Sequence, residues 1–164
     1  MIRIGNSTDI HALKPGKSLV LGGLEIESHV EAIGHSDADA LLHSIAEALL
    51  GSLALGDLGS HFPDTDPKYK GIRSSVLLKE VYAMIKNKGF RLVNLDCMVL
   101  LERPKLKPYI HAIQQNIADL LETDISFISV KATTGEKLGI IGREEAIMCQ
   151  STVLIEDTHT IKYL

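Results

Sequence analysis

Residues 37–53 carry an apolar stripe that constrains the fold more than any other segment of the chain. Apolar side chains recur there at helical spacing, at Ala38, Leu41, Leu42, Ile45, Leu49 and Leu53. Residues three and four apart lie on one side of a helix, so the pattern predicts an amphipathic helix with its leucines in a core. The rest of the chain must therefore supply an apolar layer against which this helix packs.

The other apolar patterns predict strands and two further helices. Strands are expected at 2–5, 19–21, 24–26, 90–101, 127–132 and 146–155, with Gly22-Gly23 as a hairpin turn. In the long strand, one buried face is expected to hold Val93, Leu95, Cys97, Val99 and Leu101. Further helices are expected to begin at a cap at Ser74 or Ser75 and again near Ile110. These elements predict an α+β fold, a single-layer mixed sheet with helices on one face and ferredoxin-like topology.

The composition is typical of one compact soluble domain over residues 1–164. Of the 164 residues, 45% are hydrophobic and 23% charged, and the formal net charge is −4. Single domains cluster around roughly 100–150 residues, and the apolar fraction excludes an intrinsically disordered chain. The slight acidity argues against a nucleic-acid-binding protein, and no stretch approaches the roughly 20 apolar residues that span a bilayer.

The two cysteines indicate a reducing compartment. Cys97 and Cys149 lie far apart in apolar strand-like runs, without CxxC spacing, so we predict buried free thiols. The N-terminal residues lack the apolar core of a signal peptide and the composition of a transit peptide. We therefore expect a cytoplasmic protein, or one of the plastid stroma whose transit peptide has been removed.

A metal site is suggested by Asp9-Ile10-His11 together with the polar side of the first helix. In an extended segment Asp9 and His11 point the same way, although a D-x-H pair alone also fits a polar turn. Ser36, Asp39, His43 and Glu47 are expected to share one arc of the helix, where the alternative is a solvated face. His43 would complete an Asp/His/His set, which leaves the fourth position of a zinc ion open for substrate.

Two segments resemble anion-binding cradles. Gly34-His35-Ser36-Asp37 precedes the first helix, where unpaired N–H groups bind anions, and the alternative is helix capping by Ser36 or Asp37. Residues 133–137 offer hydroxyls, backbone N–H groups and Glu136, a hard oxygen ligand suited to Mg²⁺. The long loop 56–71 is expected to be functional. Together these features predict a diphosphate substrate and chemistry at phosphorus.

Six motifs in a fixed order carry a family resemblance. They are Asp9-Ile10-His11, GHSDAD at 34–39, ALGDLG at 54–59, FPDTDP at 62–67, Pro104-Lys105 and KATTGEKLG at 131–139. The chain is similar to the 2-C-methyl-D-erythritol 2,4-cyclodiphosphate synthase family of the non-mevalonate isoprenoid pathway, from about Arg3 to Ile155. The resemblance implies a homotrimer with active sites at subunit interfaces. Its substrate would be 4-diphosphocytidyl-2-C-methyl-D-erythritol 2-phosphate, whose 2-phosphate attacks the β-phosphorus and expels CMP.

The resemblance also implies the metal and catalytic residues. Zn²⁺, or another divalent transition metal, would be bound by Asp9, His11 and His43, and Mg²⁺ or Mn²⁺ by Glu136. The positions credited with stabilising the transition state are His35 and Thr134.

The implied substrate contacts come from five segments of the chain. Residues 62–66 would face the erythritol part, residues 101–107 the cytosine, and Thr133 and Arg143 the phosphates. The full set is Asp9, His11, His35, Ser36, Asp57, Gly59, Phe62, Pro63, Asp64, Thr65, Asp66, Leu101, Pro104, Lys105, Leu106, Lys107, Thr133, Thr134, Glu136, Ile140 and Arg143.

Several positions depart from the family pattern. Glu47 stands where aspartate is usual, Ile140 where phenylalanine is usual, Glu144 where glycine follows the arginine, and Ser7-Thr8 where glycine and an aromatic residue precede D-x-H. In some relatives, a channel on the trimer axis binds isoprenoid diphosphates. The departures that bear on binding in this channel are Thr8, Ile140 and Glu144. The alternatives to a cyclase are a zinc-dependent phosphoesterase with the same triad and a non-catalytic metabolite-binding trimer.

Overall fold

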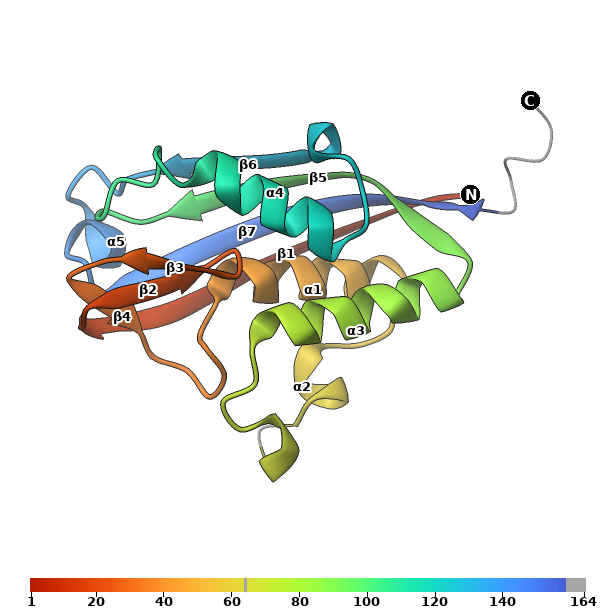
Figure 1. Cartoon of the computed structure of the whole chain (residues 1–164), viewed down its shortest axis with the longest axis horizontal. Helices are drawn as coiled ribbons and strands as arrows, with labels where there is room; N and C mark the ends of the chain where they lie inside the picture. The colour runs from red at the N-terminus through yellow and green to blue at the C-terminus, as the bar shows by residue number, and fades with distance from the viewer. Residues whose placement is uncertain (64, 159–164) are drawn as a thin grey trace.

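The computed structural model describes residues 1–63 and 65–158, which form a main sheet, a hairpin and helices (Figure 1). The strands of the main sheet are β1 (Ile2–Pro15), β4 (Val30–Ala32), β5 (Phe90–Leu100), β6 (Ile128–Thr133) and β7 (Ala146–Asp157). The hairpin pairs β2 (Ser18–Leu21) with β3 (Leu24–Glu27). The helices are α1 (Ala40–Ser52), α2 (Leu58–His61), α3 (Ser74–Asn87), α4 (Ile110–Leu120) and α5 (Gly139–Gly142), with 3-10 turns η1 (Pro67–Tyr69) and η2 (Ile125–Phe127).

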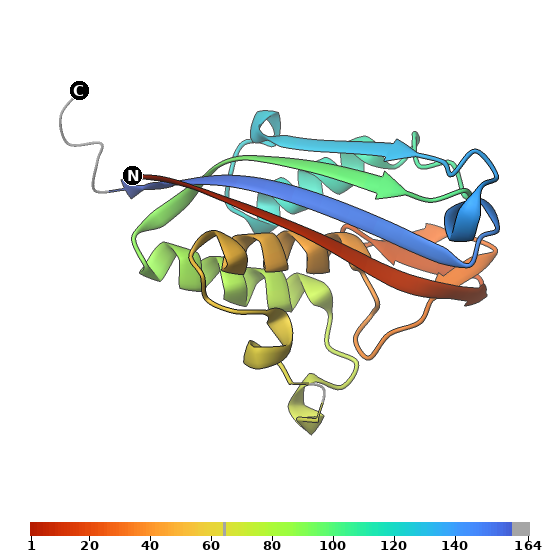
Figure 2. The ribbon, with the colours of Figure 1, turned by 180° about the vertical axis from the view of Figure 1, so that it is seen from behind.

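The main sheet is mixed and has its long helices on one face, as predicted. Its strand order is β4-β1-β7-β5-β6, with β5 and β6 parallel and the other neighbours antiparallel. Figure 2 shows the strands nearer the viewer and α1, α3 and α4 behind them. The leucine stripe is buried in the core, since Leu41, Leu42, Ile45 and Leu49 are fully buried, and α1 meets the sheet through Ser44, whose hydroxyl lies 2.6 Å from that of Ser151 in β7.

The predicted ferredoxin-like topology is wrong. A ferredoxin-like chain runs β-α-β-β-α-β, whereas here α4 connects β5 to β6 and β7 follows without a long helix. The helical crossover makes β5 and β6 parallel neighbours, and β7 returns antiparallel between β1 and β5.

The first strand is much longer than the predicted segment 2–5. It pairs with β7 from Ile2–Glu156 to Ala12–Ala146, and then with β4 from Leu13 to Pro15. This long-range pairing keeps residues 9–11 extended. Asp9 and His11 therefore lie on the same face of β1, the face covered by α1.

Gly5 lets α1 lie directly against β1. A Cβ atom at this position would come within 1.8 Å of the Ala48 carbonyl oxygen of α1. Any larger residue would therefore separate the strand that carries Asp9 and His11 from the helix that carries His43.

The first helix begins at Ala40 instead of Asp37, because Asp39 is its N-cap. The Asp39 carboxylate accepts hydrogen bonds from the N–H groups of Leu42 (3.0 Å), Gly22 (3.0 Å) and Gly23 (2.6 Å). It thus joins the helix to the hairpin turn, where Gly22 and Gly23 have φ of +61° and +78° as a two-residue turn requires. The placement of Asp39 on the polar arc is wrong, since its side chain is fully buried.

We expect the substitution Asp39→Asn to destabilise the protein by about 2 kcal/mol, because an amide turns a donor toward a buried N–H group. Urea unfolding followed by circular dichroism measures the change in the free energy of unfolding. Asp124→Asn is the control, since Asp124 caps the exposed turn η2 through a single backbone N–H, that of Ser126. An equal loss in both variants would contradict the joining role of Asp39.

Other differences are local. A β-bulge between Leu92 and Asn94 brings Leu92 into the core beside Leu95 and leaves Val93 only partly buried. The prediction that Val93 lies on the buried face of the strand is therefore wrong.

Cys97 and Cys149 are buried and free, as predicted. Strand β4 and the short helices α2 and α5 lie in segments without a predicted element. Within residues 1–63 and 65–158, no helix has both the length and the apolar character to cross a membrane.

Candidate functional site

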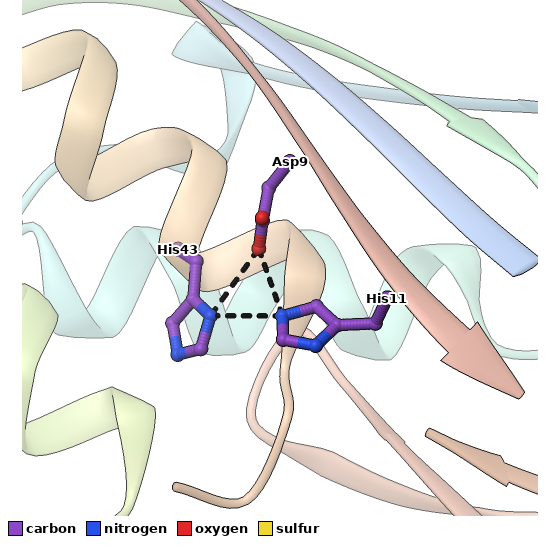
Figure 3. A group of neighbouring side chains, drawn as sticks. All are labelled: Asp9, His11 and His43. Carbon is purple, nitrogen blue, oxygen red and sulfur yellow. Dashed lines mark hydrogen bonds and ion pairs between the residues drawn. The ribbon is translucent and has the colours of Figure 1, made fainter. Parts of the chain in front are cut away.

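A carboxylate and two imidazoles converge between β1 and α1 (Figure 3). Asp9 Oδ2 lies 3.0 Å from His11 Nε2 and 3.2 Å from His43 Nδ1, and these two nitrogens are 3.3 Å apart. Among the described residues this is the one group of three or more such side chains that could hold a metal ion. All three side chains are partly buried. One carboxylate oxygen and two imidazole nitrogens form a donor set that fits zinc with an open fourth position.

Backbone structure fixes the orientation of His11. Its Nδ1 lies 2.8 Å from the Ile33 carbonyl oxygen, which accepts but cannot donate a hydrogen bond. The proton of the neutral ring is therefore on Nδ1, and Nε2 presents a lone pair toward Asp9 and His43. Such a carbonyl partner behind a histidine is typical of metal ligands.

The electrostatics of the triad favour a cation. Burial alone would raise the pKa of Asp9, but hydrogen bonds and charge interactions with His11 and His43 outweigh it and hold the pKa well below its usual range. When Nε2 of His11 is also protonated it donates to Asp9, and this hydrogen bond raises the pKa of His11 despite burial. A metal ion would compete with a proton for His11, so metal affinity should increase with pH.

The triad lines a cavity of about 820 Å³. The predicted site residues that line this cavity are Asp9, His11, His35, Ser36, His43, Gly59, Phe62 and Thr65. Tyr69, whose ring meets that of Phe62 edge-on at 5.4 Å, also lines it. The structure thus brings Asp9, His11 and His43 together with part of the loop 56–71.

A second cavity, of about 460 Å³, contains another part of the predicted site. The predicted residues that line it are Leu101, Pro104, Lys105, Leu106, Lys107, Thr133, Thr134 and Glu136. The two cavities share no lining residue. Within one chain, the predicted cytosine pocket and the triad are therefore separate.

Comparisons with known proteins identify the family of this chain. A family model described as the YgbB family matches residues 2–156. A 2-C-methyl-D-erythritol 2,4-cyclodiphosphate synthase from Shouchella clausii is 51% identical over 156 residues, 95% of this chain and 98% of the relative. This chain belongs to the YgbB family. The resemblance inferred from the six motifs is thus confirmed.

Solved structures extend the YgbB assignment to the fold. The bifunctional IspDF from Campylobacter jejuni matches with a TM-score of 0.91 and 42% identity, over 97% of this chain and 44% of that protein. A 2C-methyl-D-erythritol-2,4-cyclodiphosphate synthase in a form bound to CDP matches with a TM-score of 0.88 and 36% identity, over 94% of this chain and 100% of the other.

Some residues expected from the YgbB resemblance lie outside the linings of both cavities. They are Asp57, Pro63, Asp66, Ile140 and Arg143. Asp57 caps α2 by accepting from the Ser60 N–H (2.8 Å), and Asp66 caps η1 by accepting from the Lys68 N–H (2.9 Å). Arg143 donates to both carboxylate oxygens of Glu145 at 2.9 Å. Asp64 lies outside the described residues.

In both predicted anion cradles, polar groups already make hydrogen bonds within the chain. The Gly135 N–H donates to Glu102 Oε2 at 3.0 Å, and the Glu136 N–H to Thr134 Oγ1 at 3.3 Å. In the other cradle, α1 starts only at Ala40, and Ser36 Oγ lies 3.1 Å from His43 Nε2. Capping of α1 by Ser36 or Asp37 is wrong, because Asp39 is the cap.

Two departures from the YgbB pattern have structural explanations. The longer side chain of Glu47 lines the triad cavity, and its Oε1 accepts a hydrogen bond from the Leu58 N–H (3.0 Å) at the start of α2. Glu144 has φ of +58°, the left-handed conformation that favours glycine. It interacts with Arg103 Nε (2.6 Å) and His29 Nε2 (2.5 Å), which places its carboxylate between a guanidinium and an imidazole.

Three residues near the site have contacts that no sequence pattern predicts. Glu47 was expected only on a polar arc, Glu102 had no expected role, and Ser74 was a candidate helix cap. The backbone N–H of Ser74, which opens α3, instead donates to Asp37. Their roles depend on contacts between distant segments, and no local pattern in the sequence signals those contacts.

Proposed function

We propose that this chain converts 4-diphosphocytidyl-2-C-methyl-D-erythritol 2-phosphate to 2-C-methyl-D-erythritol 2,4-cyclodiphosphate and CMP. The cyclodiphosphate synthase activity, a lyase activity, follows from membership of the YgbB family. The observation that carries the proposal for this chain is the convergence of Asp9, His11 and His43 on one cavity. We also propose that residues 1–164 act as a single domain.

In this reaction a phosphate oxygen of the substrate forms a bond to its own β-phosphorus. The bond from the β-phosphorus to the bridging oxygen breaks, and CMP leaves with that oxygen and its electron pair. The nucleophile is already an anion, so no side chain has to remove a proton. The obstacles are charge repulsion and alignment, which enzymes reduce by electrostatic stabilisation and orientation.

The described residues would divide these tasks between the two cavities. His35, at the triad cavity, and Thr134, at the other, would stabilise the transition state. Thr134 is preorganised, since its hydroxyl donates to Glu136 Oε1 at 3.2 Å. Residues 101–107 would hold the cytosine, and the segment with Phe62 and Thr65 would face the erythritol part and exclude water.

Two metal sites belong to the proposal. Asp9, His11 and His43 would hold Zn²⁺, whose donor set they match, and Glu136 would contribute a carboxylate oxygen to Mg²⁺ or Mn²⁺. When bound, these cations act as Lewis acids that neutralise phosphate oxygens. The exposed Glu136 has φ of +51°, which turns its backbone sharply at the rim of the second cavity.

We expect the substitution Glu136→Gln to preserve zinc binding while raising the Mg²⁺ concentration needed for half-maximal turnover roughly tenfold or more. A neutral amide is a much weaker ligand for a hard cation than a carboxylate. Magnesium titrations of turnover and zinc analysis of the purified variant test this. Glu122→Gln is the control, since Glu122 pairs with Lys86 and lines neither cavity. An unchanged requirement would exclude Glu136 from the magnesium site.

A homotrimer with active sites between subunits would join the two half-sites. The triad and the predicted cytosine pocket occupy different cavities of one chain, so an adjacent subunit would have to bring them together. The sheet face opposite the helices supports this, because Ile4 is 68% exposed and Ile10 is 47% exposed there. Light scattering on the purified protein tests the trimer, and a monomer with full turnover would contradict it.

The axial channel of such a trimer is also part of the proposal. Ile140, which is 41% exposed, would give it an apolar wall for an isoprenoid diphosphate. Because Arg143 already binds Glu145, a substrate phosphate that contacts Arg143 would have to compete with that carboxylate.

Phosphorus NMR of the reaction products tests the proposed function. The cyclase predicts CMP and a cyclic diphosphate in equal amounts. A phosphoesterase with the same triad would instead release inorganic phosphate or an open-chain phosphate. A non-catalytic metabolite-binding protein would bind the nucleotide without releasing CMP in the presence of Zn²⁺ and Mg²⁺. Either of these results would overturn the proposal.

A further inference from the structure

His43 has a second set of partners behind the triad. Its Nδ1 faces Asp9 and His11, and its Nε2 faces the start of α3 (Figure 3). There Nε2 lies 2.7 Å from Ser74 Oγ and 3.1 Å from Ser36 Oγ, and Ser74, the nearer of the two, is only 1% exposed. A buried hydroxyl at this distance is a strong hydrogen-bond partner for the ring.

Asp37 in turn holds Ser74. The Ser74 N–H donates to Asp37 Oδ2 at 3.0 Å, and the Ser74 hydroxyl makes a short hydrogen bond to Asp37 Oδ1. A carboxylate only accepts hydrogen bonds, so the single proton of the hydroxyl must point toward Asp37. Ser74 Oγ is therefore left to accept a hydrogen bond from His43.

The nearer contact, to Ser74, indicates where the proton of the His43 ring lies, and Ser36 Oγ can accept from the same ring N–H. If Ser74 Oγ accepts, the donor is His43 Nε2–H, and a neutral imidazole then has its lone pair on Nδ1. His11 Nδ1–H donates to the Ile33 carbonyl, which leaves its lone pair on Nε2. Asp9 Oδ2, His11 Nε2 and His43 Nδ1 thus direct three electron pairs toward one another, an arrangement that a shared cation stabilises.

We propose that Ser74 and Asp37 are positioning residues that hold His43 in the Nε2–H form, with Nδ1 ready to bind a metal ion. This inference rests on the metal centre of the proposed function. It also connects the centre to the start of α3, where the segment with Gly59, Phe62 and Thr65 ends. We call the hydrogen-bonded chain Asp37–Ser74–His43 the relay. Its loss should weaken zinc binding by 10- to 100-fold, as is typical for groups that orient metal-bound histidines.

The first test measures zinc affinity by competition with a chromogenic chelator. Ser74→Ala removes the hydroxyl but keeps the N–H that donates to Asp37, and we expect about 10- to 100-fold weaker zinc binding. Ser75→Ala is the matched control, because it removes the neighbouring hydroxyl outside this relay and should bind zinc like the wild type. Asp37→Asn keeps the shape but offers an amide donor, and should weaken zinc binding as well. Equal zinc affinity in Ser74→Ala and the wild type would overturn the inference.

The second test needs no variant. Long-range ¹H–¹⁵N NMR of the zinc-free wild-type protein reports which ring nitrogen of His43 carries the proton. We expect Nε2–H in the wild type and a shift toward Nδ1–H in Ser74→Ala. A wild-type His43 protonated on Nδ1 would overturn the inference. If the wild type had Nε2–H but bound no zinc, the positioning of His43 would stand and the proposed metal centre would fail.

Discussion

Replacing His43 with alanine is expected to remove tightly bound zinc and lower turnover by roughly a thousandfold or more, because several kcal/mol of charge stabilisation are lost. Asp9 and His11 alone leave only two ligands from β1. The fold should persist, since the leucine stripe of α1 faces away from His43 and is untouched. Elemental analysis, turnover and circular dichroism measure the three effects.

The control for this variant is His111→Ala. His111 is exposed on α4 and lines neither cavity, so its loss should change neither zinc content nor turnover. If His43→Ala kept full activity in the presence of a chelator, His43 would not be a metal ligand. If it lost its secondary structure, the assumption that His43 is separate from the core would be wrong.

Periodic patterns made the grouping of Asp9, His11 and His43 predictable from the sequence. Asp9 and His11 are two apart in an extended segment, and His43 lies on the polar side of a helix with a leucine stripe. Each of these local rules holds in the structure. Their meeting depends on β1 continuing to Pro15, which in turn depends on pairing with β7 near the other end of the chain.

Residues with two structural partners were not predictable in this way. Asp39 sits at helical spacing from His43 but serves as a cap that also holds the Gly22-Gly23 turn. Ser74 was a plausible helix cap, yet its hydroxyl lies between Asp37 and His43. The bulge at Leu92–Asn94 likewise moves Val93 off the buried face. These roles arise from packing between distant segments, which a local pattern does not encode.

The same dependence on packing makes Gly5→Ala the substitution with the largest expected effect on the fold. Its Cβ would lie 1.8 Å from the Ala48 carbonyl oxygen, a backbone atom that cannot rotate away. Strand β1 and helix α1 would have to separate, at a cost of about 3 kcal/mol or more. The separation would also move Asp9 and His11 away from His43, so zinc affinity should fall together with stability.

A second glycine in the same region provides the control for this prediction. Gly51 lies in α1, is exposed, and a Cβ there would meet nothing within 4 Å. Gly51→Ala should therefore stabilise the protein by about 1 kcal/mol, the usual gain from replacing a helical glycine. Urea unfolding and zinc competition on both variants test the pair. If Gly5→Ala unfolded at the wild-type urea concentration and kept its zinc affinity, close contact between β1 and α1 would not be what aligns the triad.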